Sequence, residues 1–313
     1  MQLFSGHEHA PRGVVDGLPA WDRCAVMGVV NVTPDSFSDG GMWFEPRAAV
    51  KHGLELVADG ADLVDVGGES TRPGASRVDE SEELRRVVPV VRALAAEGVT
   101  VSVDTMRASV AAEAVAAGAR LVNDVSGGRA DSRMVPVVAQ LGVPFVVMHW
   151  RGQSSDMNER AVYGDPVAEV LAELREAVDA AVDGGIAEER IVVDPGLGFA
   201  KEAPHDLALV AGLRRLGAEL GRPMLVAASR KRFLGRVLAT PDGSPPPARE
   251  RDAATAAVSA LAARDGAWAV RVHAVRASAD AVRVARAVEE ASRPWDEGGD
   301  GQAGAGQGGR GSR

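Results

Sequence analysis

The chain has 313 residues, of which 46% are hydrophobic and 25% are charged, so it is long enough to bury the core of an ordinary globular protein. Its formal net charge of −9 gives no long-range attraction to nucleic acid or to an anionic membrane. The single cysteine, Cys24, excludes a disulfide framework and a thiolate metal site within one chain.

The two ends of the chain differ in composition from its middle. Residues 1–13 lack the apolar run of a signal peptide, and no segment approaches the roughly 18 apolar residues of a membrane span, so we expect a cytoplasmic protein. We expect an irregular N-terminal extension at residues 1–20 and one domain at residues 21–293. Residues 294–313 are predicted to be a disordered tail, because Gly, Gln and Ser dominate from residue 298 onward.

Eight short apolar runs recur along the chain, with room for a helix between successive runs. Continuous Val-rich runs are typical of parallel strands that are buried on both faces. The predicted strands lie at residues 24–30, 62–66, 99–103, 120–122, 144–148, 191–193, 223–227 and 268–272.

Helical patterns separate these runs. Asp79, with Glu82 three residues later, predicts a capping box at the start of one helix. Asp165 followed by Pro166 predicts a second helix start, because proline suits the first helical position. Further helices are predicted in the Ala-rich segments at residues 108–117, 253–263 and 279–288. Residues 240–248 contain three consecutive prolines and predict a surface loop.

Strands that alternate with helices predict an α/β protein with a parallel sheet. Two architectures satisfy this pattern: a closed (βα)8 TIM barrel and an open, doubly wound sheet. A count of eight strands favours the single-domain TIM barrel.

Polar or ionisable side chains follow every predicted strand, and in barrels the active site lies at these C-terminal strand ends. Single residues also have structural interpretations. Asp104 could cap a helix, Asp194 could form a turn, His149 and His273 could be buried structural histidines, and Arg230 with Lys231 could be a solvated pair. Structural roles do not explain why all eight strand ends are polar, so we predict one ring of site residues.

The ring contains two chemical sets. Carboxylates and an amide that suit the edge of a flat heterocycle are found at Asp104, Asn123 and Asp194. Groups that suit a polyanion are found at Asn31, Arg72, Arg271 and His273. The Asn31 oxygen is a ligand type that Mg²⁺ shares readily with phosphate oxygens. Neither a phosphate-binding loop of the nucleotide-binding type nor a His/Cys zinc cluster is present in the sequence.

The strand-end motifs resemble those of the dihydropteroate synthase family in sequence and in order. Residues 27–41 read MGVVNVTPDSFSDGG and residues 66–74 read VGGESTRPG. Shorter matches follow at residues 102–105, 123–128, 194–199, 229–231 and 271–273. The resemblance covers roughly residues 24–292. It implies a transferase of folate biosynthesis that condenses 6-hydroxymethyl-7,8-dihydropterin diphosphate with p-aminobenzoate, with Mg²⁺ as cofactor. It also implies a homodimer and competition by sulfonamides.

The resemblance assigns roles residue by residue. Pterin binding falls to Asp104, Asn123, Met148, Asp194, Phe199 and Lys231. Diphosphate binding falls to Asn31, Thr71, Arg72, Arg271 and His273, with Asn31 also the metal ligand. The p-aminobenzoate site falls to Phe37, Thr71, Pro73, Phe199 and Ser229. The catalytic set is Asp35, Arg72, Lys231, Arg271 and His273.

Two positions depart from the family's commonest pattern: Ala227 stands where Gly is frequent, and Ala274 stands where Asp is frequent after His273. The second change removes a residue that would orient His273. Two other functions stay open at this point. One is a pterin-dependent methyltransferase barrel, which needs no diphosphate groups. The other is a paralogue that binds pterin without turnover.

Overall fold

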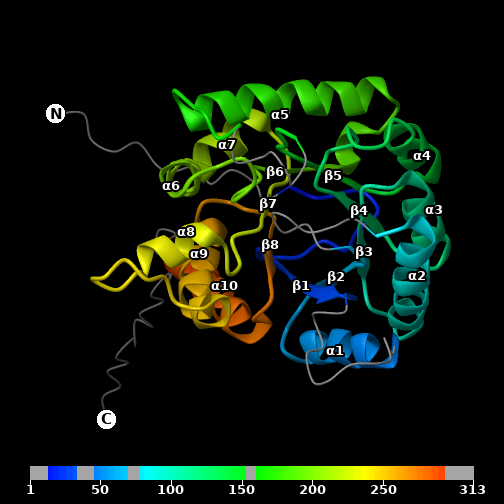
Figure 1. Ribbon diagram of the computed structural model, residues 1–313, viewed down its shortest axis with the longest axis horizontal. Coiled ribbons are helices and arrows are strands. Elements are labelled where there is room, and N and C mark those ends of the chain that lie inside the picture. Colours follow the sequence, from blue (N-terminus) through cyan, green and yellow to red (C-terminus); the bar gives the residue numbers. More distant parts are fainter. Residues whose placement is uncertain (1–12, 34–45, 70–77, 153–159, 293–313) are drawn as a thin grey trace, which may run out of the picture.

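The computed structural model describes residues 13–33, 46–69, 78–152 and 160–292, and these form a ring of helices around a central sheet (Figure 1). The tail predicted at residues 294–313 lies outside the described residues. Eight parallel strands make up the sheet: β1 (Ala25–Asn31), β2 (Leu63–Gly67), β3 (Val101–Asp104), β4 (Leu121–Asp124), β5 (Phe145–Met148), β6 (Ile191–Asp194), β7 (Leu225–Val226) and β8 (Ala269–Val272).

The sheet closes on itself. The strand order is β6-β5-β4-β3-β2-β1-β8-β7, so the first and last parts of the chain pair directly through β1 and β8. A bridge between Val193 and Met224 joins β6 to β7, and the Val193 amide donates to the Pro223 carbonyl at 2.9 Å. The predicted (βα)8 barrel is therefore confirmed, and the open-sheet alternative is wrong.

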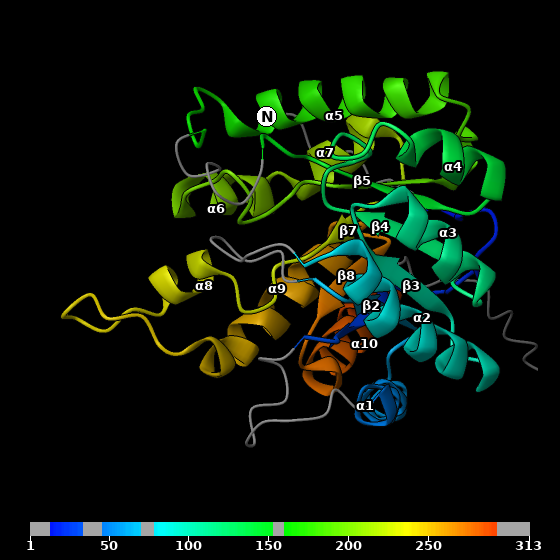
Figure 2. The ribbon, with the colours of Figure 1, turned by 45° about the vertical axis from the view of Figure 1, so that its right-hand side comes forward.

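Helices cover the outside of the barrel in chain order, and Figure 2 shows the same arrangement from a second direction. They are α1 (Pro46–Ala58), α2 (Glu80–Ala96), α3 (Ala108–Ala116), α4 (Met134–Leu141), α5 (Pro166–Asp183), α6 (Ala203–Ala211), α7 (Leu213–Leu220), α8 (Arg232–Val237), α9 (Asp252–Arg264) and α10 (Val275–Ala291). Two helices follow β6 and two follow β7, so a pattern of one helix per strand is too simple. No helix in the described ranges is long and apolar enough to cross a bilayer.

The alternation of side chains along each strand builds two apolar layers. Val26 on β1 packs outward against the helices, whereas its neighbour Met27 points into the barrel. The barrel interior near the strand starts is filled by aliphatic side chains and by Trp268. Val15 and Leu18 join this inner cluster, so residues 13–20, which form no helix or strand, close the N-terminal end of the barrel.

Strand positions are confirmed, with a consistent offset. Most predicted strands begin one or two residues early, and several end early as well. Strand β4, for example, runs through Asn123 and Asp124, which sequence reasoning placed just after the strand. Polar residues extend the strands because their backbone groups continue the pairing with the neighbouring strand.

The two predicted helix starts differ in outcome. Asp165 accepts hydrogen bonds from the Val167 and Ala168 amides at the start of α5, as predicted. Asp79 occupies the cap position of α2, but its side chain makes no capping bond. The predicted capping box is therefore wrong, and the Glu82 carboxylate binds Arg85 and Arg86 instead.

Candidate active site

The C-terminal strand ends bring several predicted site residues into one row. Backbone register pairs Asn31 with Gly67, Gly67 with Asp104, and Asp104 with Asn123. These positions belong to four successive strands that lie far apart in the sequence. The row is a direct result of parallel pairing, since parallel strands of a barrel end at the same rim.

A charged network crosses the barrel mouth behind this row. Arg271 on β8 donates from Nε to Asp65 Oδ2 at 2.6 Å and from Nη2 to Asp104 Oδ2 at 2.7 Å. Asn123 Nδ2 donates to the same Asp65 oxygen at 3.0 Å. Asp65 is fully buried, and its Oδ1 has no hydrogen-bond partner among the described residues. The network thus leaves one buried carboxylate oxygen unsatisfied by the described residues.

Sequence reasoning missed Asp65. The residue lies in the middle of the apolar run that forms β2, and no strand-end pattern singles it out. The available signal was a carboxylate inside a strand that is otherwise apolar and buried on both faces. A charged group at such a position needs a partner in the barrel interior.

Burial changes the acid–base behaviour of the carboxylates at the mouth. Desolvation raises the pKa of Asp104 to about 7, although the positive charge of Arg271 opposes this rise. Desolvation also raises the pKa of Asp194, and the charge of Lys231 opposes it. Buried carboxylates of this kind are characteristic of functional sites.

The turn after β6 (residues 195–202) forms a second wall of the mouth. Asp194, which pairs with Met148 on β5, accepts the Gly196 amide on its Oδ1 at 2.7 Å. Asp194 therefore shapes this turn, as the structural interpretation proposed, while it keeps its other oxygen free of bonds from described residues. Lys231 donates from Nζ to the Leu197 carbonyl.

Lys231 faces the turn after β6 rather than forming a solvated pair with Arg230. Its ammonium lies 4.8 Å from the centre of the Phe199 ring, and desolvation of this half-buried side chain lowers its pKa to about 8. The neighbouring Arg230 does serve a structural role, because it forms a bidentate ion pair with Asp252 at 2.7 and 2.8 Å.

Ser229 and His273 meet at the end of β7 and β8. Ser229 Oγ lies 2.9 Å from His273 Nδ1 and accepts the His273 amide at 3.1 Å. The ring of His273 is therefore oriented by Ser229, although Ala274 offers it no partner. Ala227 is also buried here, just after the short strand β7.

The other histidine, His149, is buried and bonds Glu173 and Lys201, in agreement with the structural interpretation. The predicted residues Asp35, Phe37, Thr71, Arg72 and Pro73 lie outside the described residues.

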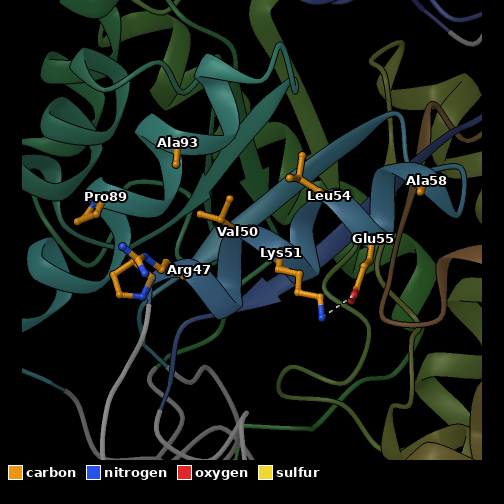
Figure 3. A pocket seen from close by; sticks show the side chains of 9 residues that line it. Arg47, Val50, Lys51, Leu54, Glu55, Ala58, Pro89 and Ala93 are labelled. Carbon is orange, nitrogen blue, oxygen red and sulfur yellow. Dashed lines mark ion pairs between the residues drawn. The ribbon is translucent and has the colours of Figure 1, made fainter.

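A surface groove of about 580 Å³ lies between α1 and α2 on the outside of the barrel (Figure 3). Its lining is mostly aliphatic, with an ion pair between Lys51 and Glu55 at 3.8 Å. None of the strand-end residues lines it. The groove is therefore separate from the barrel mouth.

Comparison with known proteins agrees with this location. A family model described as "Pterin binding enzyme" matches residues 27–273, from within β1 to the end of β8. The dihydropteroate synthase of Mycobacterium leprae is 58% identical over 260 residues, which cover 83% of this chain and 91% of that protein. The chain belongs to the dihydropteroate synthase family.

Further members of the family are similar over the same region. The dihydropteroate synthase of Bacillus subtilis is 45% identical over 82% of this chain and 85% of its own length. A solved structure of the Xanthomonas albilineans dihydropteroate synthase with 4-aminobenzoic acid has a TM-score of 0.78 and 47% identity, and covers 86% of this chain and 94% of that one. As a dihydropteroate synthase, the chain is a transferase of folate synthesis. The methyltransferase alternative is thereby set aside.

Proposed function

We propose that this dihydropteroate synthase carries out its reaction in the barrel mouth around Arg271. The reaction forms a C–N bond between the pterin methylene carbon and the p-aminobenzoate nitrogen, and it breaks the C–O bond to diphosphate. The observation that carries this proposal is the Asp65–Arg271–Asp104 network, which joins three strands at the rim where barrel enzymes act.

Pterin recognition is supported by unsatisfied acceptors. Asp65 Oδ1 and the second oxygen of Asp194 accept no bond from described residues, and Asn123 presents an amide beside them. An aminopyrimidine edge offers parallel N–H donors that match such carboxylates. Met148, which is 3% exposed, and Phe199 would line the pterin site with apolar surface.

Diphosphate binding would fall to Asn31, Thr71, Arg72, Arg271 and His273. Growing negative charge on the leaving group is stabilised most strongly by fixed donors that are already in place. Arg271 is fixed in this way, because two carboxylates orient its guanidinium.

Mg²⁺ fits the donor set at the same place. The described residues contain no cluster of three His, Cys, Asp or Glu side chains that could enclose a metal ion. Asn31 at the end of β1 supplies one hard oxygen ligand, and Mg²⁺ commonly takes one or two protein ligands together with phosphate oxygens and water. When bound, the ion would neutralise charge on the diphosphate.

Bond breaking leaves positive charge on the pterin ring. The carboxylates of Asp104 and Asp194 lie in the mouth and would stabilise that charge in the low-dielectric interior. Phe199, Ser229 and the stem of Lys231 would position p-aminobenzoate, together with Phe37, Thr71 and Pro73. Sulfonamides would compete for this position; a dihydropteroate synthase of Yersinia pestis has been solved in a sulfonamide drug complex.

The test is diphosphate release by the purified protein, with dihydropterin diphosphate and Mg²⁺, in the presence and absence of p-aminobenzoate. Release that is coupled to dihydropteroate formation is the expected result. Tight pterin binding without coupled release would instead establish the non-catalytic paralogue and would direct attention to Ala227 and Ala274.

We further propose a cytoplasmic homodimer. The lone cysteine, Cys24, is buried as a free thiol, which suits a reducing compartment. Val284 and Val288 on α10 are 63% and 61% exposed, and Leu261 on the adjacent α9 is 39% exposed, so apolar surface is available for a second copy. Sedimentation equilibrium tests the dimer.

A further inference from the structure

Another lysine, Lys201, is buried against the turn after β6, and no predicted role includes it. Its side chain is 3% exposed. Its Nζ is 3.0 Å from the carbonyl oxygens of both Gly196 and Phe199 and 2.9 Å from His149 Nδ1. One ammonium group thus ties two carbonyl groups of the turn, those of Gly196 and Phe199, to His149 after the end of β5.

The turn has a backbone conformation that needs such support. Gly196 has φ +67°, and a Cβ there would lie 2.3 Å from the His149 carbonyl oxygen. Ala200 has φ +48°, which is unfavourable for a residue with a Cβ. Across the described residues, only Ala200 and Arg230 combine a positive φ with a side chain. They directly precede Lys201 and Lys231.

The two lysines hold the same turn from different elements. Lys201 binds the carbonyls of Gly196 and Phe199, and Lys231 binds that of Leu197. Strained backbone persists only where surrounding contacts determine it. The lysine contacts therefore account for the shape of the turn, and through it for the place of the Phe199 ring.

His149 fixes the number of donors that Lys201 must supply. The other ring nitrogen, His149 Nε2, lies 2.9 Å from a carboxylate oxygen of Glu173. A carboxylate is only an acceptor, so Nε2 carries the hydrogen and Nδ1 is left with a lone pair. Lys201 then needs three N–H groups, for two carbonyls and one ring nitrogen, and only the ammonium form has them.

Charges from every neighbouring element act on Lys201. The pKa of Lys201 is lowered to about 7, chiefly by desolvation; Lys231 and Arg151 act in the same direction, whereas Asp206 and Asp194 oppose the shift. Glu173 lies one step away, beyond His149, and it also pairs with Arg151. Desolvation likewise lowers the pKa of His149, to about 4, so the ring stays neutral.

We propose that Lys201 is a positioning residue for the transfer reaction, kept in its three-donor ammonium form by Glu173 acting through His149. It acts through Phe199 and Lys231, so the proposal rests on the proposed function. The ammonium form keeps the turn closed on the active site. Loss of its proton leaves two donors for three acceptors and loosens the turn.

The main test compares Glu173→Gln with Glu176→Gln. Both changes are isosteric and lie on α5, but Glu176 is exposed. Arg151 also donates to the Glu173 carboxylate and would hold the Gln oxygen, so the Gln amide nitrogen faces His149 Nε2. Donation from that nitrogen moves the ring hydrogen to Nδ1 and favours the neutral amine of Lys201. We expect kcat/KM for p-aminobenzoate to fall at high pH in the wild type, and Glu173→Gln to move this fall about one pH unit lower. Glu176→Gln keeps the wild-type profile. Superimposable profiles for both variants overturn the proposal.

A second variant separates positioning from folding. Lys201→Met removes all three bonds, and we expect kcat/KM to drop about 10- to 100-fold. The part of the high-pH fall that Glu173→Gln shifts should disappear, whereas any part due to Lys231, whose pKa is about 8, should remain. Adding Glu173→Gln to Lys201→Met then causes no further change in the profile, since the two residues act in series. An additive effect overturns the proposal. If Lys201→Met does not fold, Glu173→Gln still decides.

A measurement without turnover keeps the proposal distinct from the assigned reaction. ¹⁵N NMR of the His149 ring reports its tautomer, with hydrogen on Nε2 expected in the wild type and on Nδ1 in Glu173→Gln. Hydrogen on Nδ1 in the wild type overturns the inference whatever the activity. Absence of coupled diphosphate release by the wild type would overturn the proposed function and leave this tautomer result standing.

Discussion

Replacement of Arg271 by alanine tests both its effect on stability and its proposed effect on catalysis. The Arg271 guanidinium pairs with Asp65 and Asp104, which are 0% and 6% exposed. Its removal leaves two carboxylates close together and uncompensated. Breaking a buried pair in this way costs about 3–5 kcal/mol, which lowers Tm by roughly 5–10 °C in a chain of this size.

The same change removes a fixed donor from the proposed diphosphate site. We expect kcat to fall about 10²-fold or more, as for other lost donors that stabilise a developing charge. The assay follows diphosphate release with both substrates at saturation, and thermal unfolding is recorded for the same preparations. The double variant Asp65→Asn/Arg271→Ala removes one orphaned carboxylate. It should recover most of the lost stability and none of the lost activity.

Arg23 provides a matched control at the opposite end of the barrel. It forms a bidentate pair with Asp62 at 2.7 and 2.9 Å, and its side chain is 19% exposed against 18% for Arg271. Arg23→Ala should lower Tm without slowing the folded enzyme. Near-wild-type turnover in Arg271→Ala would remove Arg271 from the leaving-group site. A double variant as unstable as Arg271→Ala would show that uncompensated charge is not the cause.

Three further changes test other parts of the structure. Asp194→Asn should weaken pterin binding, and an unchanged affinity by calorimetry would contradict its place in the pterin site. Leu18→Ala should cost about 2 kcal/mol of stability, measured by urea unfolding, because it opens the apolar cluster at the strand starts, while activity persists. Asp131 binds Arg133 and the Ala108 amide, and the Arg133 bond above all lowers its pKa to about 2. The ionised Asp131 therefore contributes its full stabilisation above pH 3.8, and the contribution is lost as the pH falls toward about 2. The difference in Tm between the wild type and Asp131→Asn should close over that pH range.

Much of the barrel could be predicted because strand burial leaves a clear mark in the sequence. Runs such as that of β5 are apolar throughout, since both faces are covered. Closure was less certain from the sequence, because it depends on pairing between β1 and β8 and on one bridge next to β7. Such long-range pairing has no local signature.

The site was predicted best where motifs end a strand. Asp104, Asn123 and Asp194 lie at the rim as expected. Asp65 was missed because it lies inside a strand, and Lys201 because a lone lysine at the start of a helix usually faces solvent. Both residues bond partners that are distant in the sequence: Asp65 bonds Arg271, and Lys201 bonds His149.

The pairing of Arg271 with two carboxylates has a consequence for how products leave. When ionised, Arg271, Asp65 and Asp104 carry one positive and two negative charges, and the pair Lys231 and Asp194 adds none. The described part of the mouth therefore offers no net positive field to a free polyanion. If diphosphate binds at Arg271 as proposed, it must compete with Asp65 and Asp104 for the guanidinium, and these two carboxylates weaken the hold of Arg271 on that product.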